Sequence, residues 1–274
     1  MPSVARFLTT AALLCAAGVG GVFGARFVAD NLSDPTCEFT AAERSETMSP
    51  EQSANASTIA LVAVQRGLVP RAASIAIATA IQESKLENIN YGDADSLGLF
   101  QQRPSQGWGT EEEILNPVFA TNAFYDALVQ VEGWQDGVIT EVAQTVQRSA
   151  YPEAYADHEW QGRVLASALT GQAPAAIGCD LDAPDGAGDA AAVAEELTAL
   201  GFDARASADT VTVAAGDQAT GWALASWGVA HAEGRQVTSV QVAGQSWSRA
   251  QDPMSWTDDA TTGTGSTVVV TVAQ

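Results

Sequence analysis

One glutamate in the sequence lies where an acid catalyst for sugar chemistry is expected. Glu83 ends an apolar segment rich in Ala and Ile, and a glycine-centred apolar segment that ends in Gln101 follows it. Cleavage of a glycosidic bond needs a carboxyl group shielded enough to hold its proton near neutral pH, with polar groups nearby to bind a sugar. An ordinary helix followed by a turn has the same pattern, so this stretch alone leaves both interpretations open.

The segment that must position Glu83 is predicted to be helical. Apolar spacing and capping signals predict helices over 53–66, 71–85, 116–131, 138–148 and 159–169, and a short helix after the capping box at Thr110. Glu83 then lies in the last turn of the helix 71–85. The loop 88–108 comes next and is rich in Asn, Gly, Asp and Pro, which favours irregular structure.

Several short motifs occur in a fixed order around Glu83. They are Glu83-Ser84, Ser-Leu-Gly-Leu-Phe-Gln at 96–101, Asn116-Pro117 followed by Asn-Ala-Phe-Tyr at 122–125, and the segments 101–109 and 146–155. Over about half of the chain, this series resembles the lysozyme-like muralytic domain of actinobacterial cell-wall hydrolases, within the lytic transglycosylase and goose-type lysozyme superfamily. The resemblance implies a mainly α-helical lysozyme-like domain over 53–179 that cleaves the glycan strands of peptidoglycan.

The resemblance also implies a role for Glu83. It would act as general acid, and then as base, at the bond between N-acetylmuramic acid and N-acetylglucosamine. A lytic transglycosylase needs no second carboxylate, because the 6-hydroxyl of the sugar closes the ring. Hydrolysis needs one, and Asp93 and Asp95 are the nearest candidates. Short acidic residues beside Gly92 also favour a turn, so a structural role stays open for both.

Other side chains are candidates for substrate binding: Ser84, Tyr91, Ser96, Gln101 and Asn122. Ser84 is equally suited to capping the helix end, Gln101 to fixing the turn, and loop aromatics such as Tyr91 more often seal a core. Arg103 is expected to form a structural salt bridge.

One departure from the family pattern concerns residues 144–150. They read Gln-Thr-Val-Gln-Arg-Ser-Ala, where the family typically has Ala-Tyr-Asn-Ala-Gly with its Tyr near the catalytic Glu. Gln147 or Ser149 is a possible replacement. We therefore keep a second hypothesis, that of a catalytically weak or inactive lysozyme-like module that binds peptidoglycan or supports an envelope assembly.

A different pattern begins after the linker-like stretch 182–189. Helices are predicted over 189–200 and 219–231, and strands over 202–205, 210–214, 236–243 and 267–273. This αββαββ order predicts a small α+β sandwich over 180–274, with helices on one face of an antiparallel sheet. The whole chain is thus expected to be α+β. The tryptophans of this part suit either wall binding or a small core: Trp222, Trp227, Trp247 and Trp256.

Residues 1–30 are expected to be a membrane helix. The segment 7–25 holds 19 uncharged, mostly apolar residues, about 28 Å of helix, close to the thickness of a hydrocarbon core. We expect a single-pass plasma-membrane anchor, a polar linker over 31–52, and extracytoplasmic domains beyond it. A cleaved signal peptide, and therefore a secreted protein, is the alternative.

Charge and cysteines limit the partners further. The chain has 33 acidic and 12 basic residues, which argues against a nucleic-acid partner, because phosphate binding depends on clustered Lys and Arg. Protein partners stay unknown. Cys37 and Cys179 are the cysteines outside the apolar segment, and an exported chain can join them in a disulfide. No metal and no cofactor is expected, because His158 and His231 are isolated in the sequence.

Overall fold

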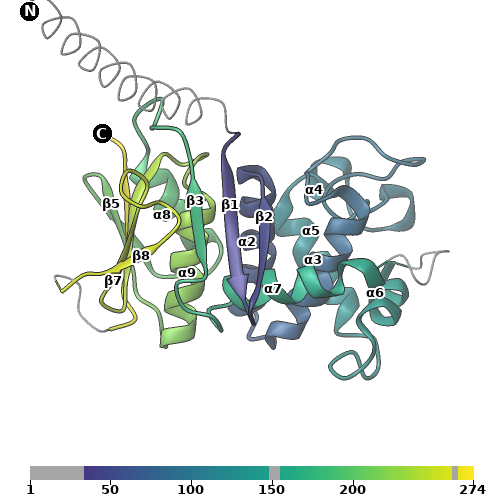
Figure 1. The fold of residues 1–274 in the computed structure, drawn as a ribbon. Helices are drawn as coiled ribbons and strands as arrows, with labels where there is room; N and C mark the ends of the chain where they lie inside the picture. Colours follow the sequence, from purple (N-terminus) through teal and green to yellow (C-terminus); the bar gives the residue numbers. More distant parts are fainter. Residues whose placement is uncertain (1–33, 148–154, 261–264) are drawn as a thin grey trace, which may run out of the picture. The chain divides into compact units, whose positions relative to one another are not determined.

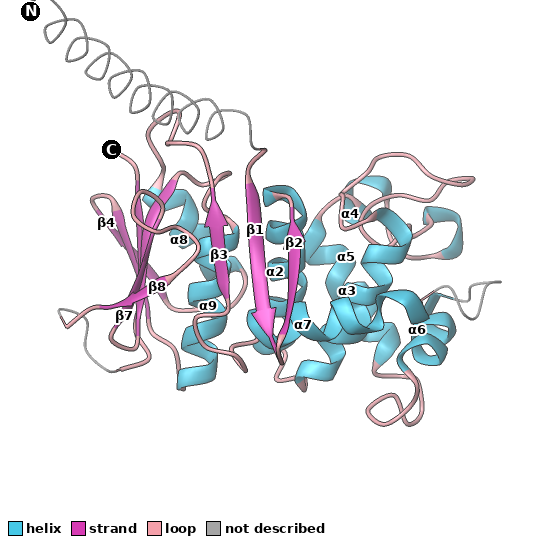
Figure 2. Cartoon of the chain, viewed as in Figure 1, coloured by secondary structure: helices cyan, strands magenta, loops and turns pink. Residues whose placement is uncertain are grey.

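The computed structural model describes residues 34–147, 155–260 and 265–274. Residues 36–274 form one compact α+β unit, and its described parts contain eight α-helices and two antiparallel sheets (Figures 1 and 2). The expected membrane segment 1–30 lies outside the described residues. Among the residues that are described, no helix has the length and apolar character to cross a bilayer.

The first half of the unit is mainly helical. Its helices are α2 (Pro50–Gln65), α3 (Pro70–Ser84), α4 (Glu111–Ile114), α5 (Pro117–Leu128), α6 (Ile139–Gln147) and α7 (Glu159–Leu169), with the 3-10 turns η1 (Pro104–Gln106) and η2 (Ala156–His158). The predicted helices are confirmed within a few residues, because local signals mark their starts. Thr110 forms the expected capping box with Glu113, and the Asn116 side chain caps α5.

The helix that carries Glu83 is enclosed by its neighbours. α3 packs against α2, α5, α6, α7 and η2, and its residues from Ala72 to Ile81 are buried. A helix that is apolar nearly all round belongs in a core rather than at a surface. The two ends of the helix reach the edge of the core, so the position of Glu83 in the last turn is set by packing of the buried middle of α3.

A small sheet precedes and follows the helical part. It consists of β1 (Thr36–Ala41), β2 (Arg44–Met48) and β3 (Ile177–Asp180), in the order β2-β1-β3. The expectation of a polar linker over 31–52 is therefore wrong for residues 36–48, and residues 50–52 already belong to α2. Cys37, Phe39 and Ala41 alternate inward along β1, and α7 packs against this strand. The expected disulfide is confirmed: Cys37 and Cys179 are bonded, on directly paired positions of β1 and β3.

The last third of the chain adds helices to one larger antiparallel sheet. Its elements are α8 (Ala190–Ala199), β4 (Ala204–Ser207), β5 (Thr210–Val213), α9 (Gln218–Ala230), β6 (Val237–Val242), β7 (Gln245–Ser248), β8 (Trp256–Asp258) and β9 (Val268–Val272). The sheet order is β4-β5-β9-β6-β7-β8. The predicted αββαββ pattern lacked β7 and β8, and the strand predicted over 202–205 begins two residues later, at Ala204.

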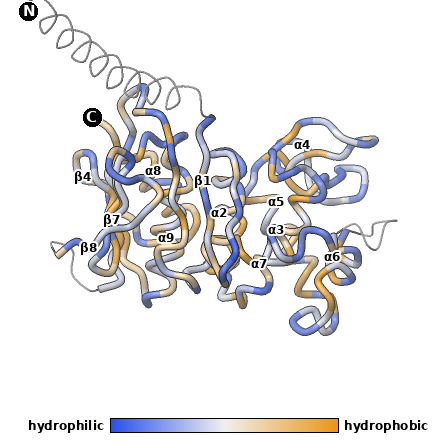
Figure 3. The backbone as a smooth tube through the Cα atoms, in the orientation of Figure 1, coloured by the Kyte–Doolittle hydropathy of each residue, from blue (hydrophilic) through white to orange (hydrophobic). Residues whose placement is uncertain are grey.

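Helix α9 joins the two halves. It packs on β6 and β9 on one side and against α2, α7 and β3 on the other, and the hydropathy colouring is largely apolar along it (Figure 3). All its residues from Gly221 to Ala230 are buried, Trp222 and Trp227 among them. Trp247 is buried too, so these tryptophans belong to the core. The domain boundary expected between residues 179 and 180 falls within β3, which contacts both β1 and α9.

Candidate active site

The end of α3 fixes the backbone around Glu83. Glu83 is half-buried in the last turn, and the helix stops because Lys85 and Leu86 take left-handed conformations, with φ of 58° and 62°. The buried Ser84 hydroxyl donates to the Ala80 carbonyl at 3.1 Å and to the Leu99 carbonyl at 2.8 Å. Ser84 therefore ties the helix end to the loop that follows.

A buried tyrosine holds the Glu83 carboxyl group. The Tyr155 hydroxyl donates to Glu83 Oε1 at 2.7 Å, and the residue is 1% exposed. Tyr155 immediately precedes η2, which packs against α3 and α7. The segment 144–150 contains no tyrosine, but a tyrosine five residues later lies beside the glutamate. Gln147 donates to the Phe100 carbonyl at 2.7 Å, and Ser149 lies outside the described residues.

A chain of hydrogen bonds runs beside this pair. Gln82 Oε1 is 3.0 Å from His158 Nε2, and His158 Nδ1 is 2.8 Å from Gln161 Oε1. Gln161 in turn donates to the Glu46 carboxylate of β2 at 3.1 Å. His158, which stands alone in the sequence, thus contacts the residue next to Glu83. Two consecutive residues of α3 are held by the segment 155–158.

The loop after α3 is braced by Gln101. Its Nε2 donates to the Tyr91 carbonyl at 3.2 Å, and a Cβ added at Gly92 would lie 1.9 Å from its Oε1. The turn-fixing alternative for Gln101 therefore has direct support. Tyr91 itself does not seal a core: its side chain is 68% exposed. Ser96 is buried, and its N–H donates to the Asp93 carbonyl at 3.0 Å.

The two candidate second carboxylates differ in their surroundings. Asp95 accepts from Arg103 Nε at 2.7 Å, and from the N–H and hydroxyl of Ser105 at 2.8 and 3.0 Å. The hydrogen bond from Arg103, followed by those from Ser105, holds the pKa of Asp95 well below its ordinary value. The expected salt bridge of Arg103 is confirmed. Asp93 is exposed and forms no ion pair with any described residue.

Asn122 lies in a different environment. Arg66 donates to its backbone carbonyl and to its Oδ1, both at 3.1 Å, and Asn122 Nδ2 donates to the Val118 carbonyl at 2.9 Å. The side chain lines a pocket shared with α2, α8 and α9, and that lining includes none of Glu83, Tyr91 and Gln101. The structure thus places Ser84, Ser96 and Gln101 at the end of α3 and in its loop, whereas Asn122 lines a separate pocket.

In the part of the chain that the structure describes, no group of three or more His, Cys, Asp or Glu side chains is arranged to hold a metal ion. A comparison of the sequence with models of known protein families gives no match. A comparison with proteins of curated function gives no match either.

Proposed function

We propose that this protein cleaves the β-1,4 bond between N-acetylmuramic acid and N-acetylglucosamine in peptidoglycan, with Glu83 as general acid and base. The observation that carries the proposal is the 2.7 Å hydrogen bond from the buried Tyr155 hydroxyl to Glu83 Oε1. Half-burial at a helix end and the hydrogen bond from a buried phenol restrain the orientation of this carboxyl group. Proton transfer to a bound sugar depends on such positioning.

The proposed reaction uses one carboxyl group twice. Glu83 protonates the bridging oxygen, and the bond from that oxygen to C1 of the muramic acid breaks. The Glu83 carboxylate then takes the proton from the 6-hydroxyl as that oxygen attacks C1, which gives a 1,6-anhydro end. Asp95 already accepts three hydrogen bonds from Arg103 and Ser105. This engagement supports the route that needs no second carboxylate over hydrolysis.

The remaining parts of the proposal concern location. The apolar segment 7–25 would anchor the chain in the plasma membrane or direct its secretion. The Cys37–Cys179 disulfide fits an oxidising, extracytoplasmic compartment, where peptidoglycan is also found. The proposed partners are therefore glycan strands and, through the N-terminal segment, the membrane.

The test is digestion of purified peptidoglycan by the full chain, with mass spectrometry of the released muropeptides. We expect 1,6-anhydro ends, and a loss of about a hundredfold or more in release by Glu83→Gln, because the general acid is removed. Glu87→Gln is the matched control, since Glu87 is exposed just beyond the helix end. Undiminished release by Glu83→Gln would refute the assignment. Reducing ends would refute the cyclisation step and direct attention to Asp93.

Exposed aromatic rings favour a second candidate, a module that binds peptidoglycan without cleaving it. Tyr91 is 68% exposed and Trp160 is 38% exposed, and the Arg44 guanidinium lies 5.4 Å from the Trp160 ring centre. Such rings can stack on sugars whether or not a bond is broken. Co-sedimentation with peptidoglycan without release of muropeptides would favour this function. Release that depends on Glu83 would exclude it.

A further inference from the structure

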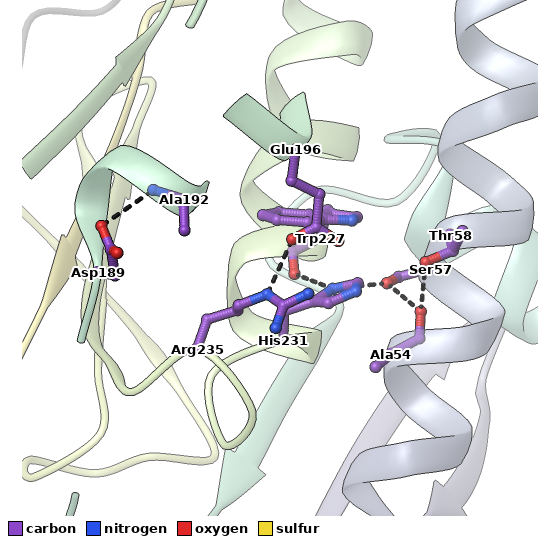
Figure 4. Close-up of polar contacts among 9 residues, drawn as sticks. All are labelled: Ala54, Ser57, Thr58, Asp189, Ala192, Glu196, Trp227, His231 and Arg235. Atoms are coloured by element: carbon purple, nitrogen blue, oxygen red, sulfur yellow. Dashed lines mark hydrogen bonds and ion pairs between the residues drawn. The ribbon is translucent and has the colours of Figure 1, made fainter. Parts of the chain in front are cut away.

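A pocket lies apart from the Glu83 site. It has a volume of about 870 Å³ and opens between the N-terminal ends of α2 and α5 and the C-terminal ends of α8 and α9. Its polar lining includes Glu51, Glu196, His231, Glu233 and Arg235. Figure 4 shows part of this region, where His231, directly after the C-terminal end of α9, contacts Ser57 of α2. The pocket is therefore built by both halves of the compact unit.

His231 lines this pocket, and one of its two ring nitrogens has no hydrogen-bond partner among the described residues. The residue is 8% exposed, and its ring stacks on Trp227 with 4.1 Å between ring centres. Nδ1 lies 3.0 Å from the Trp227 carbonyl and 3.2 Å from the hydroxyl oxygen of Ser57, which itself donates to Ala54. Because a carbonyl only accepts, this pattern puts the proton on Nδ1. Nε2 then carries a lone pair, and no described residue donates to it.

The ring is neutral at physiological pH. Burial lowers the pKa of His231 from 6.5 to about 4, against the smaller opposing influence of Glu196. A neutral ring with its proton on Nδ1 acts at Nε2 as an acceptor only. A ligand that meets this buried nitrogen must therefore bring an N–H or O–H group.

The charges around the pocket select further. The pocket lining contains three carboxylates and one guanidinium, and the guanidinium of Arg235 is paired with Glu196 at 2.8 Å. Glu51 and Glu233 form no ion pair with any described residue. The rest of the lining combines the polar residues Asn55, Thr58, Asn116 and Asn122 with apolar surface from residues such as Ala54, Pro117, Phe119 and Leu200. Acceptors and negative charge beside apolar walls suit a donor that is positively charged and carries a hydrocarbon part.

We propose that this pocket binds a small organic cation that carries a primary ammonium group on an apolar stem. The ammonium donates to His231 Nε2 and is attracted by the Glu51 and Glu233 carboxylates, while the stem lies against Phe119 and Leu200. The inference does not depend on the proposed cleavage of peptidoglycan. Glu83→Gln is therefore expected to leave this binding unchanged.

The first test compares probes of equal length and different charge. The full chain is titrated with 1,5-diaminopentane, 1,5-pentanediol and glutarate at moderate salt, and binding is followed by calorimetry and by NMR shifts of the His231 ring. We expect the diamine to bind with the highest affinity and to shift the Nε2 resonance. Equal or tighter binding of the diol or of glutarate would overturn the proposal.

The second test separates the pocket from the general acidity of the chain. Glu51→Gln and Glu233→Gln keep the side-chain shape, and each is expected to weaken diamine binding by about fivefold, the effect of one favourable ion pair. Glu195→Gln removes the same charge at an exposed position of α8 outside the pocket lining. It is expected to leave the affinity nearly unchanged. Equal effects of the three substitutions would mean non-specific attraction and would contradict the proposal.

Discussion

At the scale of single residues, the hydroxyl of Tyr155 is the contact that most directly bears on the proposed chemistry. Tyr155→Phe removes its hydrogen bond to Glu83 and keeps the buried ring. We expect kcat for muropeptide release to fall about ten- to hundredfold with little change in KM, because a hydrogen bond to a carboxyl group that orients the acid is lost. Steady-state kinetics on solubilised glycan strands measure both constants.

Tyr125→Phe is the matched control for that substitution. Tyr125 is also buried, and its hydroxyl donates to the Ile59 carbonyl at 3.0 Å, away from Glu83. Both variants are expected to lose about 1 kcal/mol of unfolding free energy. Only Tyr155→Phe is expected to lose kcat. An equal loss of kcat in both variants would mean that the Tyr155 hydroxyl affects activity only through the stability of the fold.

The sequence placed Glu83 correctly at a helix end, because a helix boundary is a local property. It did not identify the partner of Glu83, since Tyr155 lies 72 positions away. Tyr155 ends the segment 146–155 of the motif series, but nothing in that segment shows which residue its hydroxyl contacts. Asp95 was left between two roles for a similar reason. Its acidity is visible in the sequence, whereas its hydrogen bonds with Arg103 and Ser105 depend on how the loop closes.

At the scale of elements, the loop after α3 depends on a glycine that closes against α4. Gly98 has a φ of 73°, and an added Cβ would lie 2.7 Å from the Ile114 carbonyl oxygen. Gly98→Ala is expected to cost about 2–4 kcal/mol of unfolding free energy, from left-handed strain plus the collision. Gly107 has a φ of 83° with no atom within 4 Å, so Gly107→Ala should cost only about 1 kcal/mol. Urea unfolding measures the unfolding free energy of both variants. Equal losses would mean that contact with the Ile114 carbonyl oxygen adds nothing to the cost of Gly98→Ala.

Elements differ in how far the sequence predicts them. Helices were predicted well because apolar spacing and caps are local, as at Thr110 and Asn116. β1 and β2 were missed because the segment is short and largely polar, and β1 completes its pairing only with β3, far along the chain. β7 and β8 were missed because each is only a few residues long: β7 has one buried position, Trp247, and β8 has none. Pairing between strands as far apart in the sequence as β1 and β3 leaves no periodic signal in one sequence.

The disulfide fixes that distant strand pair. Cys37 and Cys179 are separated by 142 residues, so removing the bond frees a long loop in the unfolded chain. Cys37→Ser combined with Cys179→Ser is expected to lower the unfolding free energy by about 2–5 kcal/mol. Urea unfolding with and without reductant tests this, and the double variant should not respond to reductant. A wild-type protein equally stable under reducing conditions would contradict the expected contribution.

At the scale of the whole molecule, α9 makes the helical half and the sheet half into one cooperative unit. His231 at its C-terminal end contacts Ser57 of α2, 174 positions away, and Ser226 donates to the Ala168 carbonyl of α7 at 3.2 Å. These contacts are buried on both sides. We therefore expect a change at the contacts of α9 with α2 and α7 to alter the stability of all of residues 36–274. The protonation of His231 is the change that is most readily measured.

The pKa of His231 is about 4 in the folded chain and 6.5 as an ordinary side chain. Well above pH 6.5 His231 is neutral in both states, and its full contribution to stability is present. As pH falls from 6.5 toward 4, His231 becomes protonated in the unfolded chain but stays neutral in the folded chain. The unfolding free energy therefore declines across this window. The loss between pH 7 and pH 5 is about 2 kcal/mol.

The variant His231→Asn tests this contribution. Asn at this position can still donate to the Trp227 carbonyl but does not titrate, so His231→Asn should lose some stability at pH 7 yet show a pH dependence smaller by about 2 kcal/mol. Urea unfolding of both proteins at pH 7 and pH 5 gives the difference. If the unfolding free energy fell by the same amount between pH 7 and pH 5 in both proteins, other groups would account for the whole pH dependence, such as the carboxylates that lose their charge in acid.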